Sequence, residues 1–169
     1  MPLIIITNDN KTIKIDDLTP YQNINLLMSL ISTEEQSNNE NNNENNNENN
    51  NENNNLNIDN TYEIKLNATY NILNKIFDYS KHMHTIKDIN ITEQDIYNYI
   101  NKYLDCKHEI ICDLLNTADY LQYDNLVDVI CEKIADDIQK CDSIETIQKN
   151  FNIKNIISKE EEEQLLKYI

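Results

Sequence analysis

Glycine and arginine are both absent from this sequence. Without glycine the chain can hold neither of the glycine-rich loops, GxGxxG and the P-loop, that cradle nucleotide phosphates. Without arginine it has no planar guanidinium fork to grip phosphate or carboxylate with two hydrogen bonds. Any turn that needs a positive φ must then use asparagine or aspartate, and the chain is rich in both.

Positive charge is also scarce, since all fourteen basic residues are lysines and the net charge is −16. Nucleic acid and anionic membranes would repel such a chain, so neither is expected as a partner. No apolar run approaches the roughly 18 residues of a membrane span. The opening MPLIIITNDNK lacks the basic flank of a signal peptide. We therefore expect an intracellular protein of the cytoplasm or nucleus, in a host cell if it is viral.

The histidines and cysteines are not spaced as in known metal or catalytic sites. His82 and His84 lie two apart near an expected helix end, where they would point apart, so they predict no metal site. Cys106 and His108 have no glycine nearby to form an oxyanion hole. No cysteine belongs to a CxxC pair, which indicates reduced thiols, several of them in the core. The cysteines are Cys106, Cys112, Cys131 and Cys141. We predict no catalytic residue, cofactor, metal or small-molecule substrate.

The first half of the chain predicts a small sheet with helices following its strands. Two β-branched or alternating runs, 3–7 and 12–15, flank Asn8-Asp9-Asn10 and predict a β-hairpin, with a third strand at 62–66. Thr19 as N-cap and Pro20 as first helical residue predict a helix to about residue 31. Asn67 is a second candidate cap, for a helix from 68 to about 82 that is followed by a loop at 82–91.

The segment of about residues 34–56 has low complexity. It repeats the unit Asn-Asn-Asn-Glu, so its glutamates lie four residues apart. In a helix these glutamates would stack like charges on one face, and the segment has almost nothing apolar to bury. The composition predicts a disordered, solvated insert.

Helical periodicity dominates from residue 92 onward. Thr92 or Asp95 opens a helix to Leu104, and 108–121 has apolar residues on more than one side, which is typical of a central core helix. Residues 125–169 predict three further helices. Together with the strands this order predicts an α+β fold, a small three-stranded sheet capped by a helical cluster.

Capping boxes mark the starts of the last two expected helices. One is expected after Asp142, with Glu145 three residues on, and the other after Ser158, with Glu161 at the same offset. The acidic run that follows Ser158 fits the positive end of a helix dipole better than a cation site.

Tyrosine is the main aromatic residue, with no tryptophan and two phenylalanines in the chain. The tyrosines of interest are Tyr97, Tyr99, Tyr103, Tyr120 and Tyr123. Some of these tyrosines are expected to be buried in the hydrophobic core. The pair Asp119-Tyr120 either packs or forms an exposed polar-aromatic anchor of an interface, and the pattern leaves both interpretations open.

Several segments resemble one known family. NLVDVICEKIADDIQK, IETIQKNFNIKN and SKEEEEQ in the last quarter, LLNTADYL at 114–121 and the opening MPLIIITNDNKTIKID are similar to the Skp (S-phase-kinase-associated) adaptors of SCF ubiquitin ligases. The resemblance implies a BTB/POZ-like domain over 1–123 and F-box-binding helices over 124–169. The family's last helix, which carries a Trp-Cys motif, has no counterpart up to Ile169.

The resemblance also implies two partners, a cullin and F-box proteins. The family's cullin contact uses an Asn-Tyr pair, which corresponds to Asp119 and Tyr120, so the tyrosine is kept and the amide is replaced by an acid. Asp137 stands where the family usually has an apolar residue. The residues implied to contact an F-box are Cys131, Ile134, Ile138, Ile147, Phe151, Ile153 and Leu165.

Three functions follow as hypotheses. The first is a non-catalytic bridge that tethers an F-box receptor to a cullin ligase for ubiquitin-dependent degradation. The second is a decoy that sequesters receptors because Asp119 blocks the cullin, or holds the cullin without receptors. The third is a self-associating BTB scaffold.

Overall fold

The hairpin expected at the N-terminus is present. β1 (Leu3–Ile6) and β2 (Thr12–Ile15) pair antiparallel, with Leu3 opposite Ile15. The loop between them contains Asn10, whose φ of 56° is left-handed. The Asn10 N–H donates to the Thr7 carbonyl, and the Thr7 N–H donates to the Lys11 carbonyl, which closes the loop.

β3 (Tyr62–Lys65) completes the sheet, as the third expected strand. It pairs in parallel with β1, so the strand order is β2-β1-β3. The computed structural model describes residues 2–33, 62–87, 91–154 and 164. The predicted disordered insert and the last predicted helix, after Ser158, lie outside these residues.

The predicted helix from Thr19 to about residue 31 is wrong at its start. Thr19–Tyr21 form η1, a single turn of 3-10 helix, and a separate helix covers residues 25–33. The Asp17 carboxylate accepts from both the N–H and the hydroxyl of Thr19, at 2.9 and 2.6 Å. Thr19 is therefore the first residue of this turn, and the N-cap is Leu18 and not Thr19 as the sequence predicts.

α2 (Tyr70–Lys87) starts and ends later than predicted. Its first residue is fixed by the hairpin, because the Asp9 carboxylate accepts from the Tyr70 N–H at 2.9 Å. The helix replaces most of the loop predicted at 82–91. Ile86 is buried near its end, so tertiary packing stabilises a turn in which the local sequence has little helical signal.

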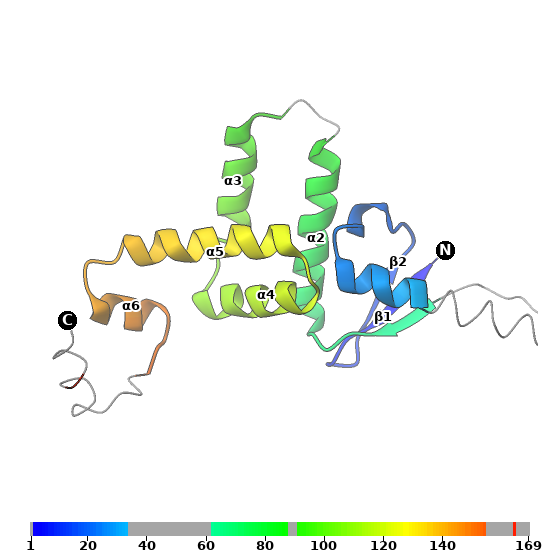
Figure 1. Cartoon of the computed structure of the whole chain (residues 1–169), viewed down its shortest axis with the longest axis horizontal. Coiled ribbons are helices and arrows are strands. Elements are labelled where there is room, and N and C mark those ends of the chain that lie inside the picture. The colour runs from blue at the N-terminus through cyan, green and yellow to red at the C-terminus, as the bar shows by residue number, and fades with distance from the viewer. Residues whose placement is uncertain (1, 34–61, 88–90, 155–163, 165–169) are drawn as a thin grey trace, which may run out of the picture.

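α3 (Glu93–Tyr103) begins as predicted, with Thr92 as N-cap in a capping box with Asp95. α4 (His108–Tyr120) packs against both α2 and α5 (Asp124–Gln139), which confirms it as the central helix. Figure 1 shows α5 running past α4 toward α6 (Ile144–Asn150), at the end of the molecule opposite the sheet.

The cap of α6 is Ser143, one residue beyond the predicted Asp142. Its hydroxyl accepts from the Thr146 N–H at 3.2 Å. The pKa of the Glu145 carboxyl is lowered by hydrogen bonds from its own backbone N–H and from the Ser143 hydroxyl. Glu145 thus lies in the first turn, where a carboxylate complements the helix dipole.

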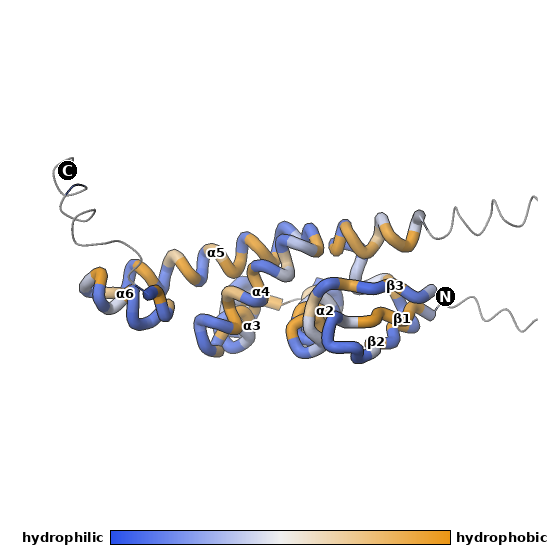
Figure 2. The backbone as a smooth tube through the Cα atoms, turned by 90° about the horizontal axis from the view of Figure 1, so that it is seen from below, coloured by the Kyte–Doolittle hydropathy of each residue, from blue (hydrophilic) through white to orange (hydrophobic). Residues whose placement is uncertain are grey.

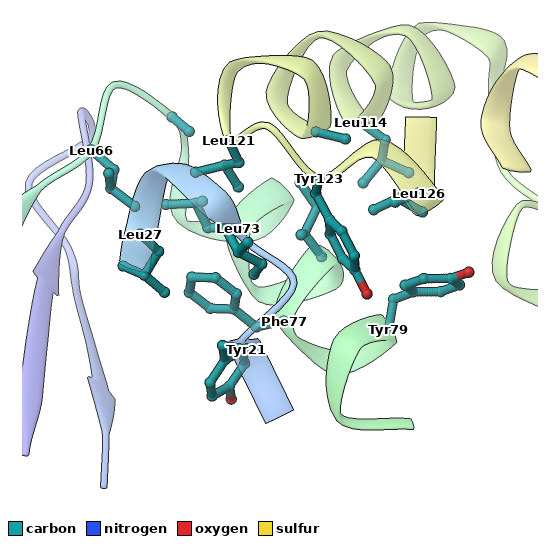
Figure 3. Packing of buried hydrophobic residues seen from close by; sticks show 14 of the residues in the cluster. Tyr21, Leu27, Leu66, Leu73, Phe77, Tyr79, Leu114, Leu121, Tyr123 and Leu126 are labelled. Carbon is teal, nitrogen blue, oxygen red and sulfur yellow. The ribbon is translucent and has the colours of Figure 1, made fainter. Parts of the chain in front are cut away.

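The core joins the sheet to α2, α4 and the first half of α5. Figure 3 shows Leu73 and Phe77 of α2 facing Leu114 and Leu121 across it, and all four are buried. Tyr79 lies 5.0 Å from Tyr103 and 6.2 Å from Tyr123, measured between ring centroids. Three of the tyrosines singled out in the sequence, Tyr99, Tyr103 and Tyr123, therefore belong to an aromatic cluster around Tyr79. With these helices on a three-stranded sheet, the α+β prediction is confirmed.

Among the described residues, three have a left-handed backbone: Asn10, Asn152 and Gln122, with φ of 56°, 51° and 54°. The expectation that only asparagine or aspartate fills such positions is wrong for Gln122. There the Tyr123 N–H donates to Ala118 and the Gln122 N–H to Asp119, the hydrogen bonds of a Schellman motif. These hydrogen bonds offset the free-energy cost of placing a residue other than glycine in the left-handed backbone conformation.

Candidate protein-interaction surfaces

The residues predicted to contact partners lie in two regions, near the two ends of α4. Asp119 and Tyr120 are on α4 itself, whereas the described F-box candidates are on α5, on α6 and in the turn after α6. Tyr120 is the last residue of α4 and lies beside the sheet, whereas His108 is its first residue and lies beside α6. At 1.5 Å per residue, α4 separates these ends by about 18 Å. The two regions are therefore separate, and Figure 1 shows α4 between the sheet on one side and α6 on the other.

At the sheet end, Tyr120 is 40% exposed, and its hydroxyl oxygen accepts from the Asn67 N–H at 3.3 Å. Its ring borders an open hollow of about 550 Å³ against the hairpin. The hollow is lined by Ile6, Thr7, Asn8, Asn10, Lys65, Leu66, Asn67 and Tyr120. Asp119 is exposed as well. The pair therefore faces solvent, with the Tyr120 hydroxyl hydrogen-bonded to the Asn67 N–H, and its use as an interface anchor stays a prediction.

At the other end, α5 and α6 expose apolar side chains. Among the described residues, five large hydrophobic side chains are exposed, and three of them lie here: Ile138 at 40%, Ile144 at 71% and Ile153 at 51%. Cys131 is also exposed. We call this region, from Cys131 to Ile153, the α5–α6 end. Figure 2 shows hydrophobic turns continuing along α5 to α6. Apolar groups gathered in this way are typical of an interaction surface.

The other predicted F-box residues are less accessible. Ile134 is half-buried and packs on the core, and Ile147 is half-buried within α6. The Phe151 ring is already covered on one side by the imidazole of His108, with 4.3 Å between centroids. Leu165 lies outside the described residues.

Asp137 stands where the family usually has an apolar residue, but its carboxylate is turned away from solvent. Its carboxylate pairs with the Lys133 ammonium one turn earlier and lies 3.6 Å from Nε2 of His108. The Asp137 side chain is 18% exposed. The i,i+4 spacing of Lys133 and Asp137 could have revealed the first pairing. The role of His108 could not be seen in the sequence, because the contact joins two helices.

Two further contacts hold α6 in place. The Asn152 side chain donates to the Glu109 carboxylate at 3.2 Å, which links the turn after α6 to the start of α4. The Cys141 thiol donates to the Asp137 carbonyl at 3.2 Å and accepts from Asn150 at 3.5 Å. α6 is thus attached to both α4 and α5.

The cysteines differ from the expectation of core fillers. Cys112 and Cys131 are exposed, and Cys106 and Cys141 are half-buried. Cys112 on α4 and Cys131 on α5 face outward, because the buried side of each helix is occupied by other apolar residues, among them Leu114 and Ile130. Burial nevertheless raises the pKa of the Cys106 thiol.

The described part of the chain has no group of three or more His, Cys, Asp or Glu side chains placed to hold a metal ion. His82 instead stacks on Tyr99 with 3.6 Å between centroids, and His108 lies on a different helix. Within the same residues, no helix is long and apolar enough to cross a membrane.

Comparison with known proteins points to one family. A family model described as "Skp1 family, dimerisation domain" matches residues 124–168, which include α5 and α6. SKP1-like protein 11 of Arabidopsis thaliana is 36% identical over 101 residues, covering 60% of this chain and 66% of the relative. The Skp1-related protein of Caenorhabditis elegans is 34% identical over 108 residues, covering 60% and 61%.

A third relative carries a function in its name. The SCF ubiquitin ligase complex protein SKP1a of Dictyostelium discoideum is 33% identical over 108 residues, covering 60% of this chain and 66% of the relative. In each of the three comparisons the chain spans just under two thirds of the relative's length.

Proposed function

Because this chain belongs to the Skp1 family, we propose that it is a non-catalytic adaptor subunit of an SCF-type ubiquitin ligase. It would bridge a cullin and the F-box of a substrate receptor, inside the cell. The name of the Dictyostelium relative, an SCF ubiquitin ligase complex protein, supports the assignment to this kind of complex.

The observation that carries the proposal is the placement of two exposed surfaces at opposite ends of α4. Asp119 and Tyr120 face solvent at one end, and the apolar α5–α6 end lies at the other. A bridge needs two partners to bind at once without competing, and a separation of about 18 Å along a helix permits this. The cullin is assigned to the first surface and the F-box to the second.

The chemistry of each surface suits the assigned partner. Ile138, Ile144 and Ile153 offer apolar contacts of the kind that receive an amphipathic helix. Tyr120 offers a large ring whose hydroxyl is already oriented by Asn67. Tyrosines of this kind often anchor interfaces.

The adaptor would contribute proximity and no bond chemistry. By holding a receptor and a cullin in one rigid assembly, it keeps a bound substrate close to the ubiquitin-loaded enzyme. The rate gain then depends on the rigidity of the connection through α4, which is packed between α2 and α5.

Co-purification of the full chain with a cullin N-terminal domain and with an F-box peptide tests the proposal. We expect a ternary complex in which neither partner displaces the other. Recovery of neither partner would rule the function out.

A decoy is the second candidate, and the exposed carboxylate of Asp119 beside Tyr120 favours it. A decoy would bind the F-box peptide and fail to bind the cullin, or the reverse, so separate affinities distinguish it from a bridge. A self-associating scaffold would instead sediment as an oligomer and stay one when the F-box peptide is added.

A further inference from the structure

We propose that His108 is a positioning residue that couples the placement of α6 to pH. The inference rests on the proposed function in one respect: the α5–α6 end is taken as the receptor-binding surface. Protonation of His108 would tighten the attachment of the turn after α6 to α4 and α5, and so strengthen receptor binding in mildly acidic conditions.

The geometry brings three helices together at this imidazole. His108 is the first residue of α4, Asp137 lies on α5, and Phe151 is the C-cap of α6. Nε2 of His108 is 3.6 Å from the Asp137 carboxylate, and the ring lies 4.3 Å from the Phe151 ring at an interplanar angle of 55°. The His108 side chain is 27% exposed, so solvent screens these contacts only in part.

Nε2 is the atom that makes this contact sensitive to a proton. It is buried, and among the described residues it has no hydrogen-bond partner. A neutral imidazole points either a lone pair, which is repulsive, or an uncharged N–H at the carboxylate of Asp137, depending on which ring nitrogen carries the proton. The protonated ring instead aims a charged N–H at that carboxylate.

The charged groups around His108 have opposite effects on its protonation, since some favour a positively charged imidazole and others disfavour it. On α5, the Asp137 carboxylate favours a positive ring and the Lys133 ammonium disfavours it. On α4, the Glu109 carboxylate favours it, while Lys107 and the positive end of the helix dipole disfavour it. The turn after α6 contributes Phe151 and Asn152, which are uncharged. The geometry assigns the deciding contact to Asp137, whose carboxylate faces the buried Nε2.

A charged ring would also bind Phe151 more strongly than a neutral one. A cation near an aromatic ring gains electrostatic attraction. Phe151 is followed by Asn152, in the left-handed turn, and by Ile153, which is 51% exposed. Holding Phe151 therefore fixes the direction in which Ile153 is presented to a partner.

Histidine is the side chain that changes charge between about pH 5 and pH 8. Hydrogen exchange of the full chain at about pH 5.5 and about pH 8 therefore tests the proposal. After correction for intrinsic exchange, we expect the amides of residues 147–153 to be protected about threefold to tenfold more at the lower pH. The affinity for an F-box peptide is expected to rise by a similar factor.

Three variants separate charge from packing. His108→Phe keeps a ring against Phe151 but cannot titrate, so its protection should not depend on pH. His108→Ala loses the ring too, and should lower protection at both pH values. His84→Ala is the matched control, since this histidine lies on α2 and should leave the pH profile unchanged.

Asp137→Asn provides an independent check if a variant of His108 fails to fold. It removes the charge that faces Nε2 and should flatten the pH profile while His108 is intact. Equal protection at both pH values in the unmodified chain, or a pH profile retained by His108→Phe, would overturn the proposal. Failure of the F-box peptide to bind at any pH would overturn the proposed function, whereas the exchange measurement needs no peptide and tests His108 separately.

Discussion

The hydroxyl of Tyr120 accepts a hydrogen bond from the backbone N–H of Asn67, at 3.3 Å. This bond joins the last residue of α4 to the segment between β3 and α2, residues that are 53 positions apart in the chain. It orients the side chain of Tyr120, which is 40% exposed, beside the exposed carboxylate of Asp119. The side chains at the sheet end of α4 are therefore held in place, so the effect of removing the charge of Asp119 on partner binding can be measured there.

Replacing Asp119 by Asn should strengthen cullin binding. The change restores the amide that the family has at this position and removes a charge next to Tyr120, so we expect an affinity about threefold to tenfold higher. Calorimetric titration with a cullin N-terminal domain measures it. Asp113→Asn removes the same charge from another exposed position of α4. Equal gains from both variants would indicate that net charge, and not this contact, limits binding.

Replacing Ile138 by Lys should weaken binding of an F-box peptide at least about tenfold, because a charge would enter an apolar contact. Ile138 is 40% exposed, so the free energy of unfolding should change by no more than about 0.5 kcal/mol. Fluorescence anisotropy with a labelled peptide measures binding, and urea titration measures stability. Gln139→Lys adds the same charge at the next exposed residue and should change binding roughly threefold or less. Unchanged binding by Ile138→Lys would place the F-box elsewhere.

Replacing Gln122 by Gly should raise the free energy of unfolding by about 0.5 kcal/mol. Relief of the left-handed backbone, with φ of 54°, outweighs the added freedom of the unfolded chain. Lys140→Gly is the control, since Lys140 ends α5 at φ of −79°. There glycine should destabilise by roughly 0.5 kcal/mol or more. Chemical denaturation of both variants measures the two changes, and a loss of stability in Gln122→Gly would contradict this account of the turn.

Replacing Asp9 by Asn should reduce thermal stability at neutral pH but much less in acid. Hydrogen bonds from the Thr7 hydroxyl, the Tyr70 N–H and Lys11 hold the pKa of the Asp9 carboxyl far below its ordinary value. Because the folded pKa is depressed, this contribution is present above the unfolded pKa of about 3.9 and is lost as pH falls below it.

Melting curves of the unmodified chain and of Asp9→Asn, at neutral pH and at about pH 3, measure this difference. Asp16→Asn, which removes only an exposed ion pair with Lys14, should show little difference at either pH. A melting-temperature gap for Asp9→Asn that persists unchanged in acid would show that the carboxylate charge is not what matters.

Local chemistry made much of this fold predictable. The alternation of Ile13 and Ile15, and the turn residues before them, specify the hairpin without help from the rest of the chain. Thr92 with Asp95 specifies the start of α3 in the same way. The F-box candidates Ile138 and Ile153 came from the family resemblance, and neither the resemblance nor their spacing showed that these side chains are exposed.

Other features depend on residues that meet only in the folded chain. α2 continues to Lys87, and Ile86 is buried in its last turn. Thr19 lies inside a 3-10 turn, where the Asp17 carboxylate accepts its N–H. In both places a contact outweighs the local preference. Sequence patterns describe what a segment favours by itself, so they miss such outcomes.

The sequence by itself determined the fold class, the family resemblance and the exclusion of nucleotide-binding loops, because these depend on composition, period and local spacing. Tertiary structure alone decided how charge and exposure are distributed over the two surfaces. It placed Asp137 of α5 next to His108 of α4, and it left Tyr120 at the surface with its hydroxyl hydrogen-bonded to the N–H of Asn67. Both results come from contacts between helices and loops whose directions no local pattern encodes.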